Sequence, residues 1–317
     1  MVALCAHVAL AYRDLGIGNS TILKTHGVKP LINLPQVGEN LQEHLFVGVQ
    51  WRLKPGQTTF DILRNNASFA LEEMAQYNAT RTGLFTELDS TLAFVPTGAV
   101  TNEQGVSSIL NAFDADLEND RLSPLQRMQL QAQRSWLVGQ RVAHYEIIQW
   151  SRGFIAPATN ESYIVALGGV SHPTSRGSVH ISSNDPLQPP AINPRFLSTK
   201  FDEVSQLALL KFVIGIGKEP QLRDVIDAQT NPDPTAQSDE DLLSWIRTSS
   251  AGGDHVIGTA VMAPQALGGV VSPSLKVYGT TNLRVADASI FPLHIAAHTQ
   301  ATVYAIAEMA AQIIQDD

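Results

Sequence analysis

The spacing of apolar residues along the chain predicts several separate helices. Residues 58–80 and 201–216 are predicted to be helical, and the polar, helix-favouring residues 121–137 predict an exposed helix. Ser238 can cap a helix that runs to about Thr248, because acidic residues follow it in the positively polarised first turn. A final helix is predicted over residues 300–315, where the apolar side chains share one side: Val303, Ile306, Ala310, Ile313 and Ile314.

The middle of the chain predicts strands. Residues 182–190 must form a loop, because their prolines cannot donate to a strand ladder. The strands and helices come in groups rather than in alternation, so the predicted fold class is α+β rather than a repeating βαβ fold. The predicted strands are Tyr145–Trp150, Ser162–Leu167, Ser178–Ser182, short ones at Pro30–Leu34 and Leu283–Ala286, and a buried one in the apolar stretch Met1 to Tyr12.

Composition limits the classes of partner. The 317 residues are 44% hydrophobic, which is ample for a large core, and the net charge is −9. This acidic balance, without a basic run, argues against nucleic acid as a partner. No apolar run approaches the ~20 residues of a membrane span, so we expect a soluble protein with no membrane partner and no signal peptide. The single cysteine, Cys5, excludes an internal disulfide and reads as a core residue. The oligomeric state and compartment stay open.

Three stretches are dense in Gly, Pro, His and Asp, the residue types of tight turns and proton chemistry. They are LPQVGENLQEH at 34–44, the stretch 175–194 that begins SRGSV, and the region from HVIGT at 255–259 to HTQATVY at 298–304. The third region begins with His255 and carries His298 near its end. Histidine titrates near neutral pH, so it can take a proton from a substrate without a large pKa shift.

These stretches, together with GGVVSPSLKVYG at 268–279 and LRVADASIFP at 283–292, resemble the glucose–methanol–choline (GMC) oxidoreductases. The resemblance implies FAD as cofactor and a small-molecule alcohol as substrate, with the hydride passing to the flavin and the proton to a histidine. It places His255 at the base position and His298 at the second position, which hydrogen-bonds the substrate hydroxyl. It also implies cofactor contacts from six residues: Asn40, Leu41, Asp287, Ala288, Thr299 and Gln300.

Other interpretations of these residues remain open. Asp287 fits a turn or capping role, and Asn40 fits a loop cap. His294 and His298 are four residues apart, which would suit zinc on one helical face, but no third ligand is evident, so no metal is predicted. The sequence has no G-x-S-x-G elbow and no phosphate-binding G-x-x-x-x-G-K-[ST] loop.

The family's G-x-G-x-x-G turn, which seats the FAD pyrophosphate, is absent, since Gly16-Ile17-Gly18 lacks the third glycine. We therefore expect the chain to begin inside the family pattern. The expected parts are residues 1–50 as a partial α/β FAD-binding domain, 51–250 as a substrate domain with an antiparallel sheet backed by helices, and 251–317 as a return to the FAD-binding domain that carries both histidines.

The predicted function is thus FAD-dependent oxidation of a CH–OH group, in secondary-metabolite biosynthesis by one hypothesis. Two alternatives follow from the same resemblance. One is a non-redox, cyclase-like relative, and the other is an inactive truncated relative. The sequence leaves open the identity of the substrate and the choice between oxidase and dehydrogenase.

Overall fold

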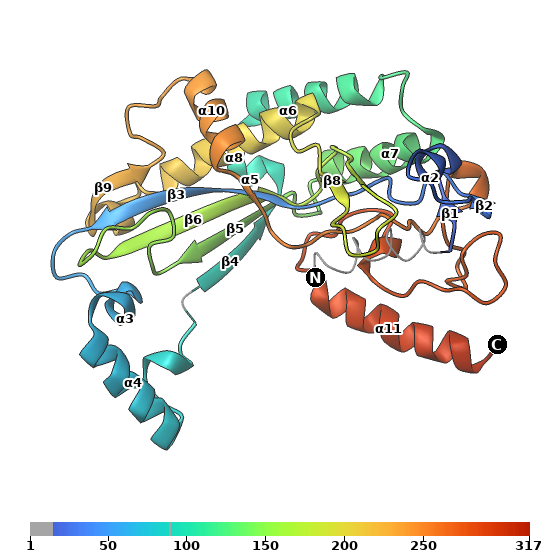
Figure 1. Cartoon of the computed structure of the whole chain (residues 1–317). Helices are drawn as coiled ribbons and strands as arrows, with labels where there is room; N and C mark the ends of the chain where they lie inside the picture. Colours follow the sequence, from blue (N-terminus) through green and yellow to red (C-terminus); the bar gives the residue numbers. More distant parts are fainter. Residues whose placement is uncertain (1–14, 89) are drawn as a thin grey trace.

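The computed structural model describes residues 15–88 and 90–317, and its centre is one six-stranded antiparallel sheet (Figure 1). The strand order is β10-β3-β6-β5-β4, and β9 also pairs with β3. The strands are β3 (Leu45–Leu53), β4 (Ser90–Val95), β5 (Tyr145–Trp150), β6 (Tyr163–Val170), β9 (Ile226–Asn231) and β10 (Ala251–Gly252). This confirms the predicted α+β class with its antiparallel sheet.

The pairing register sorts the side chains of the sheet into two faces, because successive side chains of a strand point in opposite directions. Phe46 lies opposite Gly169, and Gly48 lies opposite Leu167, which in turn lies opposite Ile148. These residues therefore share one face, and Glu146 and Trp150 join them by alternation along β5. The other face carries Val47, Val49, Trp51, Ala166 and Ile147.

Among the described residues, the helices that pack on the sheet cover this second face. α8 (Lys200–Ile216) packs on β6 and β3, α6 (Glu103–Leu117) packs on α8, and α10 (Asp239–Ser249) contacts both α8 and β3. In Figure 1, α6, α8 and α10 lie above the sheet. The approach is close because Gly168 has no side chain: a Cβ there would lie 2.9 Å from Leu209. The fully buried centre of this core includes Phe113, Phe201, Leu209, Leu210 and Ile246.

A second core joins the two ends of the described chain. The strands β1 (Ile17–Gly18) and β2 (Ile32–Asn33) pair in parallel, and they pack with residues 257–291 and with α11 (Gln300–Gln315). Its buried members include Ile17, Leu34, Ile257, Val261, Val270, Val271, Phe291 and Ala310. Segments far apart in sequence thus meet beyond one end of the sheet, where β10 leads to residue 255 (Figure 1).

The remaining elements are short or lie at the periphery, apart from α7, which packs on α6. They are α2 (Ser20–Thr25), α3 (Asp61–Asn65), α4 (Ala67–Thr80), η1 (Leu84–Thr86), α5 (Thr97–Val100), α7 (Pro124–Gly139), β7 (Ser178–His180), β8 (Ala191–Asn193), α9 (Pro220–Arg223), η2 (Gln265–Leu267) and η3 (Ala288–Ile290).

The sequence predicted several elements well and others wrongly. β5 and α11 have the predicted limits, and Ser238 caps α10 as predicted. The helix predicted over 58–80 is divided, because Asn66 is extended and its side chain caps α4 by accepting from the N–H of Phe69. The strand predicted at Leu283–Ala286 is wrong, since only a single bridge between Lys276 and Arg284 forms there. The predicted strand in Met1 to Tyr12, and Cys5 within it, lie outside the described residues. The division into three parts stays a prediction.

Candidate active site

The structure brings the two predicted catalytic histidines together. The ring centroids of His255 and His298 lie 4.7 Å apart, with an angle of 42° between the ring planes. His255 follows the edge strand β10, whereas His298 precedes α11, so the sheet and the second core each supply one ring. The side chain of His298 is 46% exposed. The pair is therefore close enough for both rings to contact one small hydroxyl group.

A cavity of about 470 Å³ lies beside the two rings, and its walls come mainly from the uncovered face of the sheet. Trp150 and Phe154 meet edge to face, with ring centroids 4.9 Å apart. Phe46 fits because Gly169 and Gly253 lack side chains: a Cβ at either would lie 2.6 Å from its ring. The apolar lining residues are Phe46, Ile148, Trp150, Phe154, Ile155 and Leu167.

His255 is held on three sides by buried groups. Its main-chain N–H donates to Oε1 of Glu43 over 2.9 Å, and its carbonyl oxygen lies 2.9 Å from Nε2 of His294. Its ring Nδ1 lies 3.0 Å from Nδ1 of His44. His44 is itself fixed, since its Nε2 lies 2.9 Å from the carbonyl oxygen of Ser171. Position and orientation of the candidate base are thus determined before any ligand binds.

Burial changes the pKa values of these rings. It lowers the pKa of His255 to about 4; the nearby His298 adds to this effect and Asp254 opposes it. Burial also lowers the pKa of His294 to about 3, and holds that of His44, stacked on His294 at 3.6 Å, well below its ordinary value. The expectation of an ordinary histidine pKa at the base is therefore wrong. At neutral pH the base is fully unprotonated and ready to accept a proton.

His298 is paired with an acidic residue that the sequence analysis did not single out. Its Nε2 lies 2.7 Å from Oε1 of Glu146, which is only 1% exposed. Burial raises the pKa of Glu146, and His298 opposes the shift. A signal was present, because Glu146 lies within the predicted strand Tyr145–Trp150 and alternation gives it the same face as Trp150.

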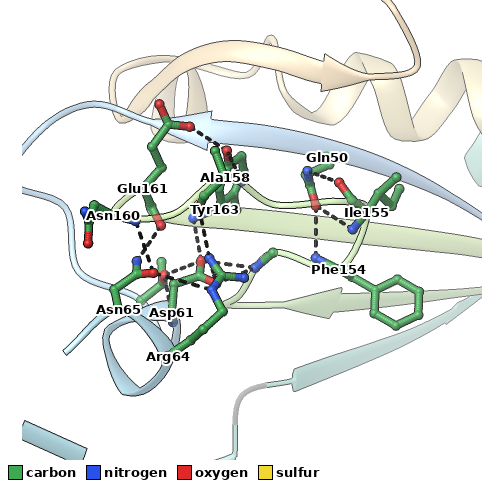
Figure 2. A network of polar contacts seen from close by, with 12 residues as sticks. Gln50, Asp61, Arg64, Asn65, Phe154, Ile155, Ala158, Asn160, Glu161 and Tyr163 are labelled. Carbon is green, nitrogen blue, oxygen red and sulfur yellow. Dashed lines mark hydrogen bonds and ion pairs between the residues drawn. The ribbon is translucent and has the colours of Figure 1, made fainter. Parts of the chain in front are cut away.

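The cavity wall after β5 is anchored by two polar side chains (Figure 2). Oε1 of Gln50 accepts from the N–H groups of Phe154 and Ile155 over 2.9 and 2.8 Å, and its Nε2 donates to the carbonyl of Ile155. The carboxylate of Asp61 accepts from the N–H groups of Gly153 and Tyr163 over 3.0 and 2.8 Å. The loop that carries Phe154 is therefore tied to β3 and α3.

The predicted cofactor residues form two neighbouring groups. Nδ2 of Asn40 donates to the carbonyl of Gly258, whose N–H donates to the carbonyl of Ala288. Leu41 is buried, and its N–H donates to the carbonyl of Gly177. Asp287 caps η3, because its Oδ1 accepts from the N–H of Ser289 over 2.7 Å, as in the alternative interpretation. Thr299 is buried and precedes α11, and Gln300 is the first, exposed residue of that helix.

The described residues give no support to a metal site. Over 15–88 and 90–317, no group of three or more His, Cys, Asp or Glu side chains could hold an ion. His294 and His298 lie in the loop between η3 and α11 rather than on one helical face, and they face the carbonyl of His255 and the carboxylate of Glu146. Within the same residues, no helix has the length and apolar character needed to cross a bilayer.

Comparison with known proteins shows that the chain is similar to GMC oxidoreductases in sequence and fold. Residues 173–307 match the family model described as GMC oxidoreductase. A dehydrogenase of Armillaria gallica is 35% identical over 95% of this chain and 48% of its own length. The structure of a fungal aryl-alcohol oxidase has a TM-score of 0.84 at 31% identity, covering 98% of this chain and 53% of its own. The structure of an FAD-dependent oxidoreductase from Chaetomium thermophilum has a TM-score of 0.83 at 26% identity, and the match covers 96% of this chain and 52% of that protein. The chain therefore spans about half the length of these proteins.

Proposed function

The chain belongs to the GMC oxidoreductase family, whose C-terminal domain it carries. From this premise we propose that it forms the substrate-facing part of an FAD-dependent enzyme that oxidises a small-molecule alcohol. The observation that carries the proposal is the pair of rings, His255 and His298, beside an aromatic-lined cavity. The family model and the two flavoenzyme-like folds support the oxidoreductase class. The alcohol substrate and the roles of individual residues are our proposal.

The chain's own residues fit FAD at this place. Oδ1 of Asn40 is buried and has no hydrogen-bond partner among the described residues, which suits a ligand donor. The first turn of α11, from Gln300, directs main-chain N–H groups outward, and such groups favour an anionic ring system. Asn40, Leu41, Asp287, Ala288, Thr299 and Gln300 would hold the cofactor. When bound, FAD supplies the acceptor for the hydride that leaves the substrate carbon.

The proton chemistry belongs to the two histidines. His255 takes the hydroxyl proton, for which its low pKa of about 4 keeps it unprotonated at neutral pH. His298 donates a hydrogen bond to the same hydroxyl oxygen and orients it, while Glu146 holds the imidazole of His298 from behind.

The cavity also favours one class of alcohol. Three aromatic rings, Phe46, Trp150 and Phe154, contribute to its walls, and the ionisable lining residues are Asp254 and the two histidines at its end. A volume of about 470 Å³ accepts a substrate of roughly one aromatic ring with a side chain. We therefore expect a hydrophobic primary alcohol, benzylic alcohols among them, rather than a sugar. A role in secondary metabolism stays a prediction.

The proposal is tested with the 317-residue chain. FAD titration followed by visible absorbance measures binding, and oxidation of benzylic alcohols with an artificial electron acceptor measures activity. His255→Gln should reduce kcat/KM by about 10²–10⁴-fold while FAD binding is retained. Absence of flavin bands after FAD addition would refute activity of this chain alone. A product formed without consumption of the acceptor would instead support the non-redox alternative.

A further inference from the structure

The hydrogen bonds behind the base determine which nitrogen of each ring carries a proton. His44 is 1% exposed, and its Nε2 lies 2.9 Å from the carbonyl oxygen of Ser171. A carbonyl oxygen accepts hydrogen bonds and never donates, so Nε2 of His44 must carry the hydrogen. A neutral imidazole has only one N–H, and therefore Nδ1 of His44 presents a lone pair.

That lone pair faces the base. Nδ1 of His44 and Nδ1 of His255 are 3.0 Å apart, so one hydrogen lies between them. Since His44 accepts, His255 must donate from Nδ1. In neutral His255 the other nitrogen, Nε2, is then the only ring nitrogen with a lone pair, and no described residue of the protein forms a hydrogen bond with it.

We propose, resting on the function proposed above, that His44 is a positioning residue: held by the carbonyl of Ser171, it keeps His255 in the Nδ1–H tautomer and thereby makes Nε2 of His255 the atom that takes the substrate proton. His294 completes the arrangement. Its Nε2 binds the carbonyl oxygen of His255, and its ring stacks on His44 at 3.6 Å. The two buried rings thus fix the side chain and the main chain of the same residue.

The same geometry argues against onward transfer of the proton to His44. When the substrate O–H bond breaks and the Nε2–H bond forms, His255 becomes an imidazolium that still donates from Nδ1. Passing that Nδ1 proton to His44 would place a charge on a buried ring that stacks on His294, where desolvation and the neighbouring rings oppose it. The charge therefore stays on His255, beside the cavity.

Nuclear magnetic resonance of the full chain, labelled with [¹⁵N]histidine, tests the tautomer without flavin or substrate. Two-bond ¹H–¹⁵N correlations at pH 7.5 should show a protonated Nδ1 and an unprotonated Nε2 for His255, and the opposite pattern for His44. The set of correlations that disappears in His255→Gln identifies the signals of the His255 ring. A protonated Nε2 on His255 in the wild-type protein would overturn the inference, even if the chain proves to be an active alcohol-oxidising enzyme.

A pair of variants separates positioning from packing. His44→Phe keeps an aromatic ring but loses the acceptor, whereas His44→Asn places an amide oxygen near the former Nδ1. We expect His44→Phe to convert His255 to the Nε2–H form and to lower kcat/KM at least tenfold, with KM nearly unchanged. His44→Asn should keep the Nδ1–H form and most of the activity. The positioning role of His44 would be contradicted if His255 kept its Nδ1–H in His44→Phe, or if both variants converted it equally to the Nε2–H form. If His44→Phe does not fold, the spectra of the wild type and of His44→Asn decide.

Discussion

A buried histidine next to the main core offers a direct test of how pH controls the stability of this protein. His144 is 2% exposed, and neither ring nitrogen makes a hydrogen bond of ordinary geometry with a described residue, although the main chain of Trp136 lies near the ring. Burial lowers its pKa to about 4, although the main chain of Trp136 opposes the shift. His172, whose ring centroid is 5.3 Å away, has a pKa lowered to about 3 by burial and by His144, and that of His294 is lowered to about 3 mainly by burial.

The sign and size of the effect follow from proton linkage. Below the ordinary pKa of 6.5, the unfolded chain protonates these rings while the folded chain does not, so stability is lost as pH falls from 6.5 toward 3–4. At pH 5 the rings of the folded protein are still neutral. The loss in unfolding free energy relative to pH 8 therefore depends on the pKa in the unfolded chain, and it is about 2 kcal/mol for each ring. The three rings together cost about 6 kcal/mol, and the raised pKa of Glu43, about 7, offsets this loss only in part. We expect acid unfolding between about pH 4 and pH 5.

His144→Phe tests this reasoning because it replaces one titrating ring with an aromatic ring that does not titrate. The assay is urea unfolding followed by circular dichroism, at pH 8 and at pH 5, for variant and wild type. Any packing cost of the phenyl ring appears at both pH values and cancels in the comparison. The variant should gain about 2 kcal/mol relative to wild type on going from pH 8 to pH 5. The same difference in unfolding free energy at both pH values would refute the reasoning.

Three further outcomes are expected. Gln50→Leu leaves the main-chain groups of Phe154 and Ile155 without their partner, so thermal unfolding should show a loss of at least about 2 kcal/mol, and unchanged stability would contradict the anchoring role. Glu146→Gln removes a charge-assisted bond to His298, so kcat/KM should fall about tenfold with the fold intact, as checked by steady-state kinetics and circular dichroism; a wild-type rate would be inconsistent with the pairing. The unprotonated state of His255 is the active one, and its pKa is about 4, so kcat/KM should stay constant as pH falls through 6.5 until unfolding begins. A reversible loss of activity centred near pH 6.5 in the folded protein would argue against His255 as the base.

The sequence predicted those parts of the fold that depend on local pattern. α11 was predicted at its limits because its apolar residues repeat every three or four positions, and β5 because it is rich in aromatic and β-branched residues. No strand was predicted at Leu45–Leu53, although β3 pairs with three other strands, since Gly48 and the polar Gln50 interrupt its pattern. The structure explains both: Gly48 has no room for a side chain beside Leu167, and Gln50 binds a loop more than 100 residues away.

The candidate site shows the same division. His255 and His298 were identified because each stands in a recognisable stretch of sequence. The part played by Glu146 depends on cross-strand register, and that of His44 depends on a ring 211 residues away, so neither follows from spacing along the chain. The low pKa of His255 arises from burial, which only the folded chain reveals.

Within one uninterrupted run, Glu43 and His44 contact His255, Phe46 lines the cavity, and Gln50 anchors the loop that carries Ile155. Adding or removing one residue early in this run would invert the later side chains of β3, turning Phe46 and Gln50 toward the helices and Val47 and Val49 toward the cavity. The number of residues between Glu43 and Gln50 is therefore fixed. Evolution or engineering can enlarge or reshape the cavity by substitution within β3, but insertions have to enter elsewhere, for example between residues 66 and 88, beyond the far end of the sheet from α11 (Figure 1).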